Sequence, residues 1–197
     1  MPSAVRTGPP AQRSGTRVRL VESRSRRAAV GWTLCALASR FADTKSRICK
    51  RSSFSLRAWQ PVFESLRQVL GEAIFARLHQ PDWQAVQAEA VRSSCTSDDR
   101  DVFVAVADGR PVGFAAVALN AFHERMGVVD IIAVDPLYQR RGIARQLMDR
   151  SAEHMRAEGT DIAAVGTGGD PGHGPARALY ETLNYTAPGV TYLMLLD

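Results

Sequence analysis

The chain has 197 residues, of which 45% are apolar, and this suits a single domain with an appended tail. Its three cysteines are an odd number without CxxC spacing, which argues against a disulfide framework or a zinc site. This usage fits a reducing compartment, so we expect a cytoplasmic protein without a bound metal. No apolar run approaches the roughly 18 residues of a membrane span, so we expect no membrane partner.

Charge divides the chain into two parts. Residues 1–57 carry 13 basic and two acidic side chains, a net charge of +11, whereas the rest carries 12 basic and 18 acidic side chains, a net charge of −6. The first part has few apolar residues and no periodicity, which predicts a basic, disordered extension over residues 1–57. The domain over residues 58–197 is mildly acidic, so nucleic acid is an expected partner only through the extension.

One short apolar run interrupts this extension. Residues 28–38 follow Arg26 and Arg27 and resemble the charged and apolar regions of an export signal. The alternatives are a targeting or nucleic-acid-binding tail and a segment that precedes the true translation start. The sequence leaves these alternatives open.

Two helices and a hairpin are predicted next in chain order. Residues 59–78 place apolar side chains at the i, i+3, i+4 spacing of an amphipathic helix. A second helix over residues 82–94 has Asp82 as its N-cap. Two β-branched and aromatic runs over residues 101–119 flank Asp108-Gly109, a dipeptide typical of a tight β-hairpin.

The rest of the chain alternates between strands and helices. The predicted ranges are a strand over 128–134, a helix over 142–159, a strand over 161–168, a helix over 174–185 and a strand over 190–196. Gly159 and Asn184 are expected to end the two helices in the left-handed conformation. This mixed order predicts an α/β fold, with a partly antiparallel sheet and helices on its faces.

The stretch YQRRGIARQL, residues 138–147, lies between a predicted strand and a predicted helix. The amides of residues 140–144 would point outward at the positive end of that helix, which is the geometry of a phosphate site. Gly142 lets the backbone come close to an anion, and the arginines add charge-assisted contacts. The alternative is that Arg140, Arg141 and Arg145 are solvated surface charges.

The common nucleotide motifs do not fit this chain. A Walker loop needs GxxxxGK[ST], and no lysine follows Lys50. The glycine-rich stretch from Gly166 fails as GxGxxG because its last position is Pro171. The expected partner therefore carries a pyrophosphate that is bound outside a P-loop or a Rossmann site.

Two segments resemble the signatures of the GCN5-related N-acetyltransferases (GNAT). IAVDPLYQRRGIARQLM is similar to motif A of that family, in which a strand precedes Q/R-x-x-G-x-G/A and a long helix; Gln139, Gly142 and Ala144 match. ARALYETLNYT resembles the second signature, A-x-x-LYE-x-x-GF. The resemblance covers residues 59–197 and implies a GNAT-like acyl-CoA N-acyltransferase fold with a splayed central sheet.

The resemblance also implies how acetyl-CoA would bind as a cosubstrate. Its pantetheine arm would pair with the main chain of the motif A strand, between two strands that splay apart. An amide near Ala133 or Val134 would polarise the acetyl carbonyl. The implied cofactor-binding residues are Ile132, Ala133, Val134, Gln139, Arg140, Arg141, Gly142, Ile143, Ala144 and His173.

Tyr180 matches the family tyrosine that often protonates the departing thiolate. The alternative is a core tyrosine on an amphipathic helix. Asp130 is the first candidate for the base that takes the proton of the amine, because it interrupts an apolar strand. Strict alternation puts Asp130 on the face of Ile132 and Val134. The alternative is an aspartate that faces solvent or pairs with an arginine.

Other polar residues near the motifs are weaker candidates. His123 and Glu124 precede the motif A strand, where a solvated loop is the simpler interpretation. His173 stands where many family members have an asparagine that contacts pantetheine. A histidine can donate the same hydrogen bond or act as a base, or it can be an exposed residue or a helix cap.

The resemblance therefore implies an acetyl-CoA-dependent N-acetyltransferase that acts by direct transfer to a primary amine, without a metal. The alternative is a non-catalytic acyl-CoA-binding or regulatory domain. The acceptor is a small-molecule amine or a protein amino group, and the acidic domain weakly favours cationic amines. The sequence leaves a homodimer open.

Overall fold

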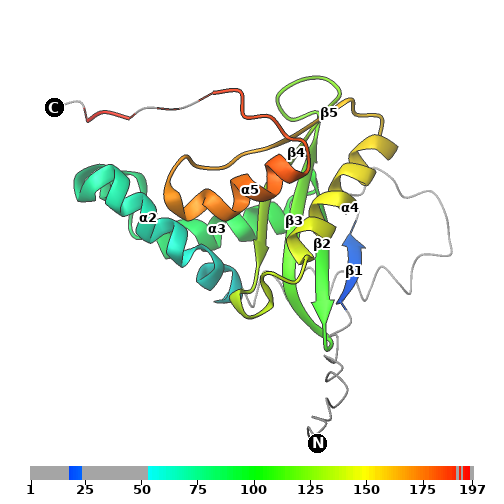
Figure 1. The fold of residues 1–197 in the computed structure, drawn as a ribbon, viewed down its shortest axis with the longest axis horizontal. Coiled ribbons are helices and arrows are strands. Elements are labelled where there is room, and N and C mark those ends of the chain that lie inside the picture. The colour runs from blue at the N-terminus through cyan, green and yellow to red at the C-terminus, as the bar shows by residue number, and fades with distance from the viewer. Residues whose placement is uncertain (1–17, 24–52, 190, 192, 196–197) are drawn as a thin grey trace, which may run out of the picture.

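The computed structural model describes residues 18–23, 53–189, 191 and 193–195 (Figure 1). In chain order the elements are β1 (Val18–Ser23), α2 (Ser53–Leu78), α3 (Trp83–Thr96), β2 (Arg100–Ala107), β3 (Arg110–Leu119), β4 (Met126–Val134), the 3₁₀ turn η2 (Pro136–Tyr138), α4 (Ile143–Ala157), β5 (Ile162–Val165), the 3₁₀ turn η3 (Pro171–His173) and α5 (Gly174–Thr182). The helices and strands predicted between residues 59 and 185 are confirmed, with shifted boundaries. The strand predicted over 190–196 lies partly outside the described residues, and Thr191 and residues 193–195 belong to no strand.

The described strands form one five-stranded sheet in the order β1-β2-β3-β4-β5. The first three pairings are antiparallel, and β4 pairs with β5 in parallel. This confirms the mixed α/β architecture. Asp108 and Gly109 join β2 to β3 with φ of 51° and 71°, since a two-residue type I′ turn needs positive φ at both positions.

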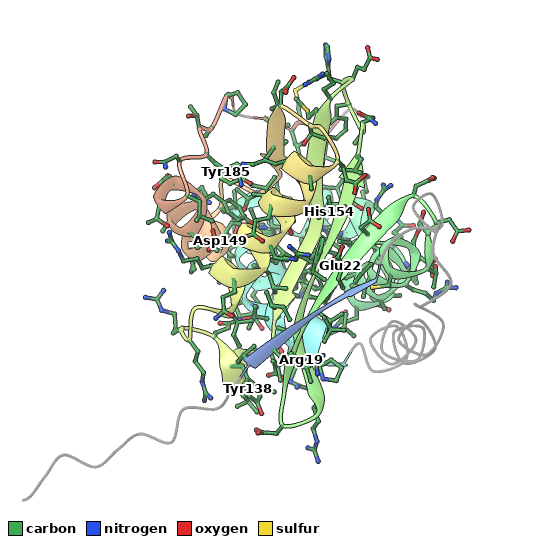
Figure 2. The ribbon with its side chains drawn as sticks, turned by 90° about the vertical axis from the view of Figure 1, so that its right-hand side faces the viewer. Arg19, Glu22, Tyr138, Asp149, His154 and Tyr185 are labelled. Carbon is green, nitrogen blue, oxygen red and sulfur yellow. The ribbon has the colours of Figure 1, made fainter. Side chains whose placement is uncertain are left out.

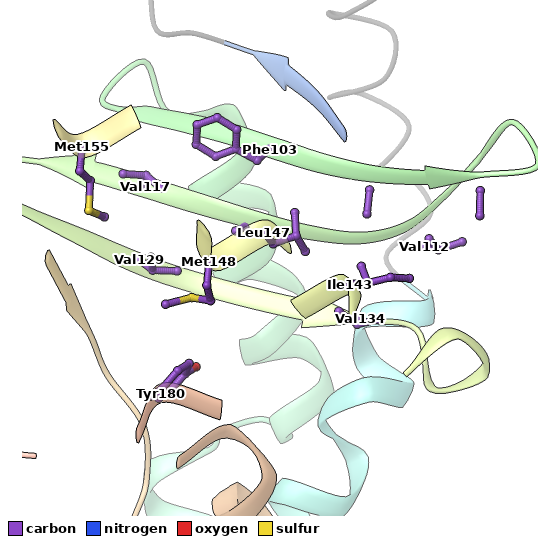
Figure 3. Packing of buried hydrophobic residues seen from close by; sticks show 13 residues of the cluster. Phe103, Val112, Val117, Val129, Val134, Ile143, Leu147, Met148, Met155 and Tyr180 are labelled. Carbon is purple, nitrogen blue, oxygen red and sulfur yellow. The ribbon is translucent and has the colours of Figure 1, made fainter. Parts of the chain in front are cut away.

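Each face of the sheet carries its own apolar cluster, because side chains alternate along a strand. On one face, Phe103 and Val129 pack with Leu147 and Met148 of α4 (Figure 3). On the other face, the cluster contains Val102, Phe114, Ala116 and Ala133 of the sheet with Val91, Cys95 and Trp59 of the helices. Thus α4 covers one face, and α2 and α3 cover the other (Figure 1).

Strand β1 is the main departure from the prediction. Disorder was expected over residues 1–57, but Val18–Ser23 pair antiparallel with β2, and α2 begins at Ser53. Val18 and Leu20 alternate and pack against the apolar cluster under α4. Such a short alternation is lost in a window long enough to detect periodicity. The remainder of the extension, with its export-like run over residues 28–38, lies outside the described residues.

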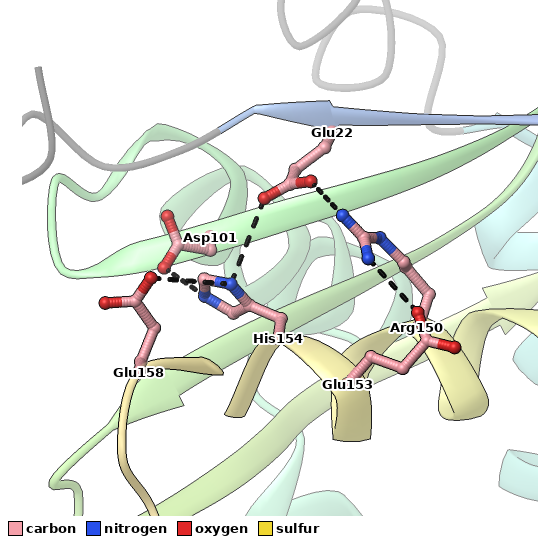
Figure 4. Close-up of polar contacts among 6 residues, drawn as sticks. All are labelled: Glu22, Asp101, Arg150, Glu153, His154 and Glu158. Carbon is pink, nitrogen blue, oxygen red and sulfur yellow. Dashed lines mark hydrogen bonds and ion pairs between the residues drawn. The ribbon is translucent and has the colours of Figure 1, made fainter. Parts of the chain in front are cut away.

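A polar cluster ties β1 and β2 to α4 (Figures 2 and 4). Arg150 donates to Glu22 of β1 across 2.6 Å and to Glu153 across 3.1 Å. The side chain of His154 is 2% exposed, and its Nε2 lies 2.8 Å from Oδ2 of Asp101 in β2. These polar contacts add to the few apolar contacts that the six-residue edge strand β1 makes with the sheet and α4.

Candidate active site

Strands β4 and β5 part halfway along their length. Their parallel pairing runs only from Met126 opposite Ile162 to Val129 opposite Val165, and β5 ends there. The second half of β4 continues to Val134 with no strand beside it on that side among the described residues. Backbone groups on such an edge need partners, so this half of β4 can pair with an extended ligand.

The direction of the open backbone groups follows from one hydrogen bond. The amide of Asp135 donates to the carbonyl of Val112 in β3 across 2.8 Å. Since successive residues in a strand point their amides to opposite sides, Val134 and Ile132 direct theirs away from β3, and Ala133 directs its own toward β3. The carbonyl of Val134 accepts a hydrogen bond of 3.1 Å from Nε2 of Gln139.

In the loop between β4 and α4, residues 139–142 have the shape of an anion cradle that leads into the first turn of α4. Arg140 and Gly142 have left-handed φ values of 59° and 78°. Gly142 is the N-cap of α4, so no N-cap side chain accepts a hydrogen bond from the first amides of the helix, and the first turn contains no acidic residue. The amides of this first turn are therefore directed outward with a positive field, as in phosphate-binding nests.

The predicted phosphate residues divide into two kinds in the structure. Ile143 is 1% exposed and Ala144 packs against the same cluster, so each can offer only its amide to a ligand. The guanidinium of Arg141 lies over the ring of Tyr138, 5.1 Å from its centroid, and the Arg140 side chain is exposed. Gln139, predicted to bind the cofactor, directs its side chain to β4 instead.

Asp135 fixes the start of this loop. Its carboxylate accepts from the amide of Leu137 at 3.1 Å and from Arg57 of α2 at 3.2 Å. The end of β4, the cradle and the first half of α2 are therefore held together. Arg57 also lines a cavity of about 280 Å³ between α2 and α3, with Glu64, Phe63, Phe75 and Trp83 among its walls.

Tyr180 of α5 is 8% exposed and belongs to the apolar cluster under α4 (Figure 3). Burial, with a smaller contribution from Tyr185, raises the pKa of Tyr180 to about 12. Tyr180 also lines a cavity of about 1050 Å³ between α4, β5, α5 and residues 183–189. The side chain is thus both a core residue and a wall of a cavity, so the two alternatives from the sequence are compatible.

The face predicted for Asp130 is wrong. Val117 pairs with Val129 and Ala116 with Ile131, so Asp130 is an extra residue in a β-bulge. The bulge interrupts alternation: Asp130 accepts from Ser94 of α3 at 3.1 Å and from Arg100 of β2 at 3.2 Å. Ile132 and Val134 instead pack on the α4 side. The alternative of an arginine-paired aspartate is the one observed.

His173 occupies the end of η3, and its Nδ1 is hydrogen-bonded to Oδ2 of Asp170. Burial raises the pKa of Asp170, but hydrogen bonds from His173 and Ser65 outweigh it, so the net shift is downward. Ser65 and Arg177 complete the surroundings of this loop. Asp170 was not among the residues predicted from the sequence, although an aspartate before a proline is a recognisable N-cap signal.

The weaker candidates lie apart from this arrangement. His123 and Glu124 are exposed in the loop between β3 and β4.

Within the described ranges, no group of three or more His, Cys, Asp or Glu side chains could hold a metal ion. Among the same residues, no helix is both long enough and apolar enough to cross a membrane.

Comparison with known sequences places these features in a family. The model of the Acetyltransferase (GNAT) family matches residues 63–185. A mycothiol acetyltransferase from Thermomonospora curvata is 30% identical over 119 residues, which are 60% of this chain and 39% of that protein. A streptothricin acetyltransferase from Streptomyces lavendulae is 44% identical over 62 residues, 31% of this chain and 32% of that protein. The chain spans well under half the length of these curated relatives.

Solved structures share the fold. An aminoglycoside acetyltransferase from an uncultured soil metagenomic sample has a TM-score of 0.52 at 19% identity, over 92% of this chain and 99% of that one. A ribosomal-protein-alanine N-acetyltransferase from Brucella melitensis has a TM-score of 0.50 at 18% identity, over 92% and 100%. This likeness concerns the fold alone, whereas the family match spans more than half of the chain. The chain belongs to the Acetyltransferase (GNAT) family.

Proposed function

We propose that this protein transfers the acetyl group of acetyl-CoA directly to a primary amine. The observation that carries the proposal is the cradle at residues 139–142, which opens beside the unpaired half of β4. One part suits a pyrophosphate and the other suits an extended amide-bearing arm, and they lie at the two ends of one short connection. Family membership and relatives named as acetyltransferases support the same reading.

The cradle would hold the pyrophosphate through the amides of residues 140–144, with Arg140 and Arg141 adding charge. Ile132 and Val134 would pair with the pantetheine arm, since their backbone groups face away from β3. The Val134 amide is better directed than that of Ala133 to polarise the acetyl carbonyl. Gln139 would act by bracing Val134.

Direct transfer needs two proton movements. The amine nitrogen bonds to the acetyl carbon while the carbon–sulfur bond breaks and its electron pair goes to sulfur. The amine gives its proton to a base, and Tyr180 donates to the thiolate, so the products are an amide and a neutral thiol. Because its pKa is about 12, the phenol stays protonated at neutral pH, and its position must compensate for its weak acidity.

A small-molecule amine is the acceptor we propose, because the relatives are named for mycothiol and streptothricin. The cavity between α2 and α3 combines Glu64 and the aromatic side chains of Phe63, Phe75 and Trp83 with the cationic Arg57 and Arg67, so its charge does not select a cationic amine. Arg57 joins that cavity to the end of β4. A protein amino group is the alternative acceptor.

An acetyl-transfer screen tests this proposal. The full chain is incubated with acetyl-CoA and streptothricin, an aminoglycoside or a peptide with a free N-terminal alanine, and thiol release is followed alongside the mass of the acceptor. We expect acetylation of at least one small amine, and a loss of about 10²–10⁴-fold in kcat for Tyr180→Phe. Binding of acetyl-CoA without transfer to any of these acceptors would favour the non-catalytic acyl-CoA-binding domain instead.

A further inference from the structure

The loop between β5 and α5 contains a histidine–aspartate pair that the proposed function does not yet use. The Asp170 side chain is 1% exposed and that of His173 is 21% exposed. Asp170 is therefore shielded from solvent, while part of the imidazole remains accessible. An ionised carboxylate can only accept hydrogen bonds, so the proton shared with His173 belongs to Nδ1.

The pair is held by close packing. A Cβ on Gly168 would come within 2.5 Å of Nδ1 of His173, and a Cβ on Gly172 would lie 2.8 Å from Cβ of Ser65 and 2.9 Å from Cα of Val62. Real Cβ atoms do not approach so closely. Glycine at both positions is thus what lets the pair form against α2.

Hydrogen bonds fix the loop from two further sides. Ser65 of α2 accepts from the amide of Gly172 at 2.9 Å. Arg177 of α5 donates to the carbonyls of Gly168 at 2.5 Å and Asp170 at 2.8 Å. The charged side chains that hydrogen-bond in this loop are Asp170, which binds His173, and Arg177 of α5, which binds the backbone. Helix α2 contributes the neutral Ser65. The imidazole is consequently held in one orientation.

This orientation decides which nitrogen is available for chemistry. A neutral imidazole carries one N–H, and Asp170 occupies it at Nδ1. Nε2 then presents a lone pair and makes no hydrogen bond to the described residues. A neutral His173 can therefore accept a proton at Nε2 but cannot donate to a ligand carbonyl there. Of the roles left open by the sequence, this favours the base.

The pair also lies at the correct end of the sheet. η3 follows the carboxyl end of β5, which is the end of β5 at which its pairing with β4 stops. His173 is the N-cap of α5, and Tyr180 follows seven residues later, roughly 10 Å further along the axis of the helix. Helix α2 packs against both η3 and the end of β4, and Arg57 and Ser65 are roughly 12 Å apart along it.

We propose that His173 is the general base of the acetyl transfer and that Asp170 is its positioning residue. Nε2 takes one proton from the ammonium form of the acceptor, which frees the nitrogen lone pair to attack the acetyl carbon, and the second N–H proton passes to solvent as the amide forms. The imidazolium, stabilised by Asp170, then returns its proton to solvent, while Tyr180 supplies the thiol proton and regains it from solvent. The proposal rests on the proposed function. It displaces Asp130, whose carboxylate is held by Ser94 and Arg100 on the α3 side.

Two amines separate a base from other roles. The full chain is assayed with acetyl-CoA and either an alkylamine, which is protonated at neutral pH, or hydroxylamine, which is largely neutral. We expect His173→Gln to lower kcat with the alkylamine by about 10²–10⁴-fold and with hydroxylamine by less than about tenfold.

The positioning role has its own readout. Imidazole ¹⁵N spectra of the full chain should show His173 as the Nδ1–H tautomer, and Asp170→Asn should move the population toward Nε2–H. Asp170→Asn should also lower turnover of the alkylamine, whereas Asp161→Asn, which changes an exposed aspartate at the opposite end of β5, should not. An Nε2–H tautomer in the wild type would overturn the proposal.

Calorimetry with acetyl-CoA separates this proposal from the proposed function. Loss of binding in His173→Gln, with equal loss for both amines, would make His173 a cofactor contact and overturn the base role. Selective loss of the alkylamine in Asp130→Asn would transfer the role to Asp130. Binding by the wild type without transfer to either amine would also contradict it, whereas a folded wild type that fails to bind acetyl-CoA would contradict the proposed function itself.

Discussion

Nε2 of Gln139 donates to the carbonyl of Val134 across 3.1 Å, which ties the cradle at residues 139–142 to the open half of β4. The two parts of the proposed acetyl-CoA site are thereby held in one register. The contact also occupies one of the carbonyls on the open edge. Gln139 would therefore contribute to binding through the protein, not through direct contact with a phosphate.

Removal of this brace should weaken binding only modestly. Gln139→Ala deletes one hydrogen bond with a net value of about 0.5–1.5 kcal/mol, so the Kd for acetyl-CoA should rise roughly 2–10-fold. Gln139→Glu, which cannot donate to the carbonyl and adds a negative charge beside the cradle, should weaken binding more. Calorimetry on the wild type and both variants checks this order. An affinity of Gln139→Ala for acetyl-CoA equal to that of the wild type would contradict the bracing role.

Ionisation of Tyr180 should affect stability at high pH. The folded state raises the pKa of this phenol to about 12 from an ordinary value of 10.0, so the folded protein favours the neutral form. The resulting stabilisation is complete below pH 10 and is lost as the pH rises through about 12, with a size on the order of 2–3 kcal/mol. Tyr180→Phe should reduce this alkaline loss, as measured by urea unfolding between neutral pH and pH 12.

Asp101 should be important for stability because it is the buried partner of His154. Asp101→Ala leaves a 2%-exposed imidazole without the carboxylate 2.8 Å from its Nε2, and a buried polar group left without a partner costs about 1–3 kcal/mol. Asp161→Ala removes an aspartate from an ion pair in which both side chains are 63% exposed, and it should change stability far less. Thermal unfolding of both variants measures the difference, and similar losses would contradict it.

Two glycines in one loop provide a matched test of the packing around Asp170. A Cβ at Gly172 meets Ser65 and Val62 of α2, whereas a Cβ at Gly169 meets nothing within 4 Å. Gly172→Ala should therefore cost about 1–3 kcal/mol and displace η3, and Gly169→Ala should be close to neutral. Urea unfolding together with the His173 tautomer would reveal both effects, and tolerance of Gly172→Ala would contradict the close packing.

Local patterns in the sequence predicted much of the fold. Three of these patterns each predict a structure from residues that lie close together in the chain. They are the i, i+3, i+4 spacing of residues 59–78, the Asp108-Gly109 turn and the glycine before α4. The cradle was predictable for the same reason, because a helix N-terminus and a left-handed glycine are local features. The order of the elements followed from the same local patterns, and it agrees with the family that the two signatures resemble.

The remaining features depend on contacts between distant segments. The bulge at Asp130 arises from the register between β3 and β4, so alternation along β4 alone gave the wrong face. Strand β1 is recognisable only through its pairing with β2, which lies about 80 residues further along. The Asp170–His173 pair depends on α2 packing against Gly172, and no local pattern reports that contact.

The central claim is that the amides at the start of α4 bind the pyrophosphate of acetyl-CoA. Gly142→Asn and Gly142→Asp are matched in shape, and both side chains tolerate the φ of 78° at this position, but only the aspartate adds a negative charge. Titration of acetyl-CoA into the full chain by calorimetry should give binding by the wild type, similar binding by the asparagine variant, and more than about 100-fold weaker binding by the aspartate variant, since like charges in contact cost several kcal/mol. Equal binding by the two variants would contradict the claim.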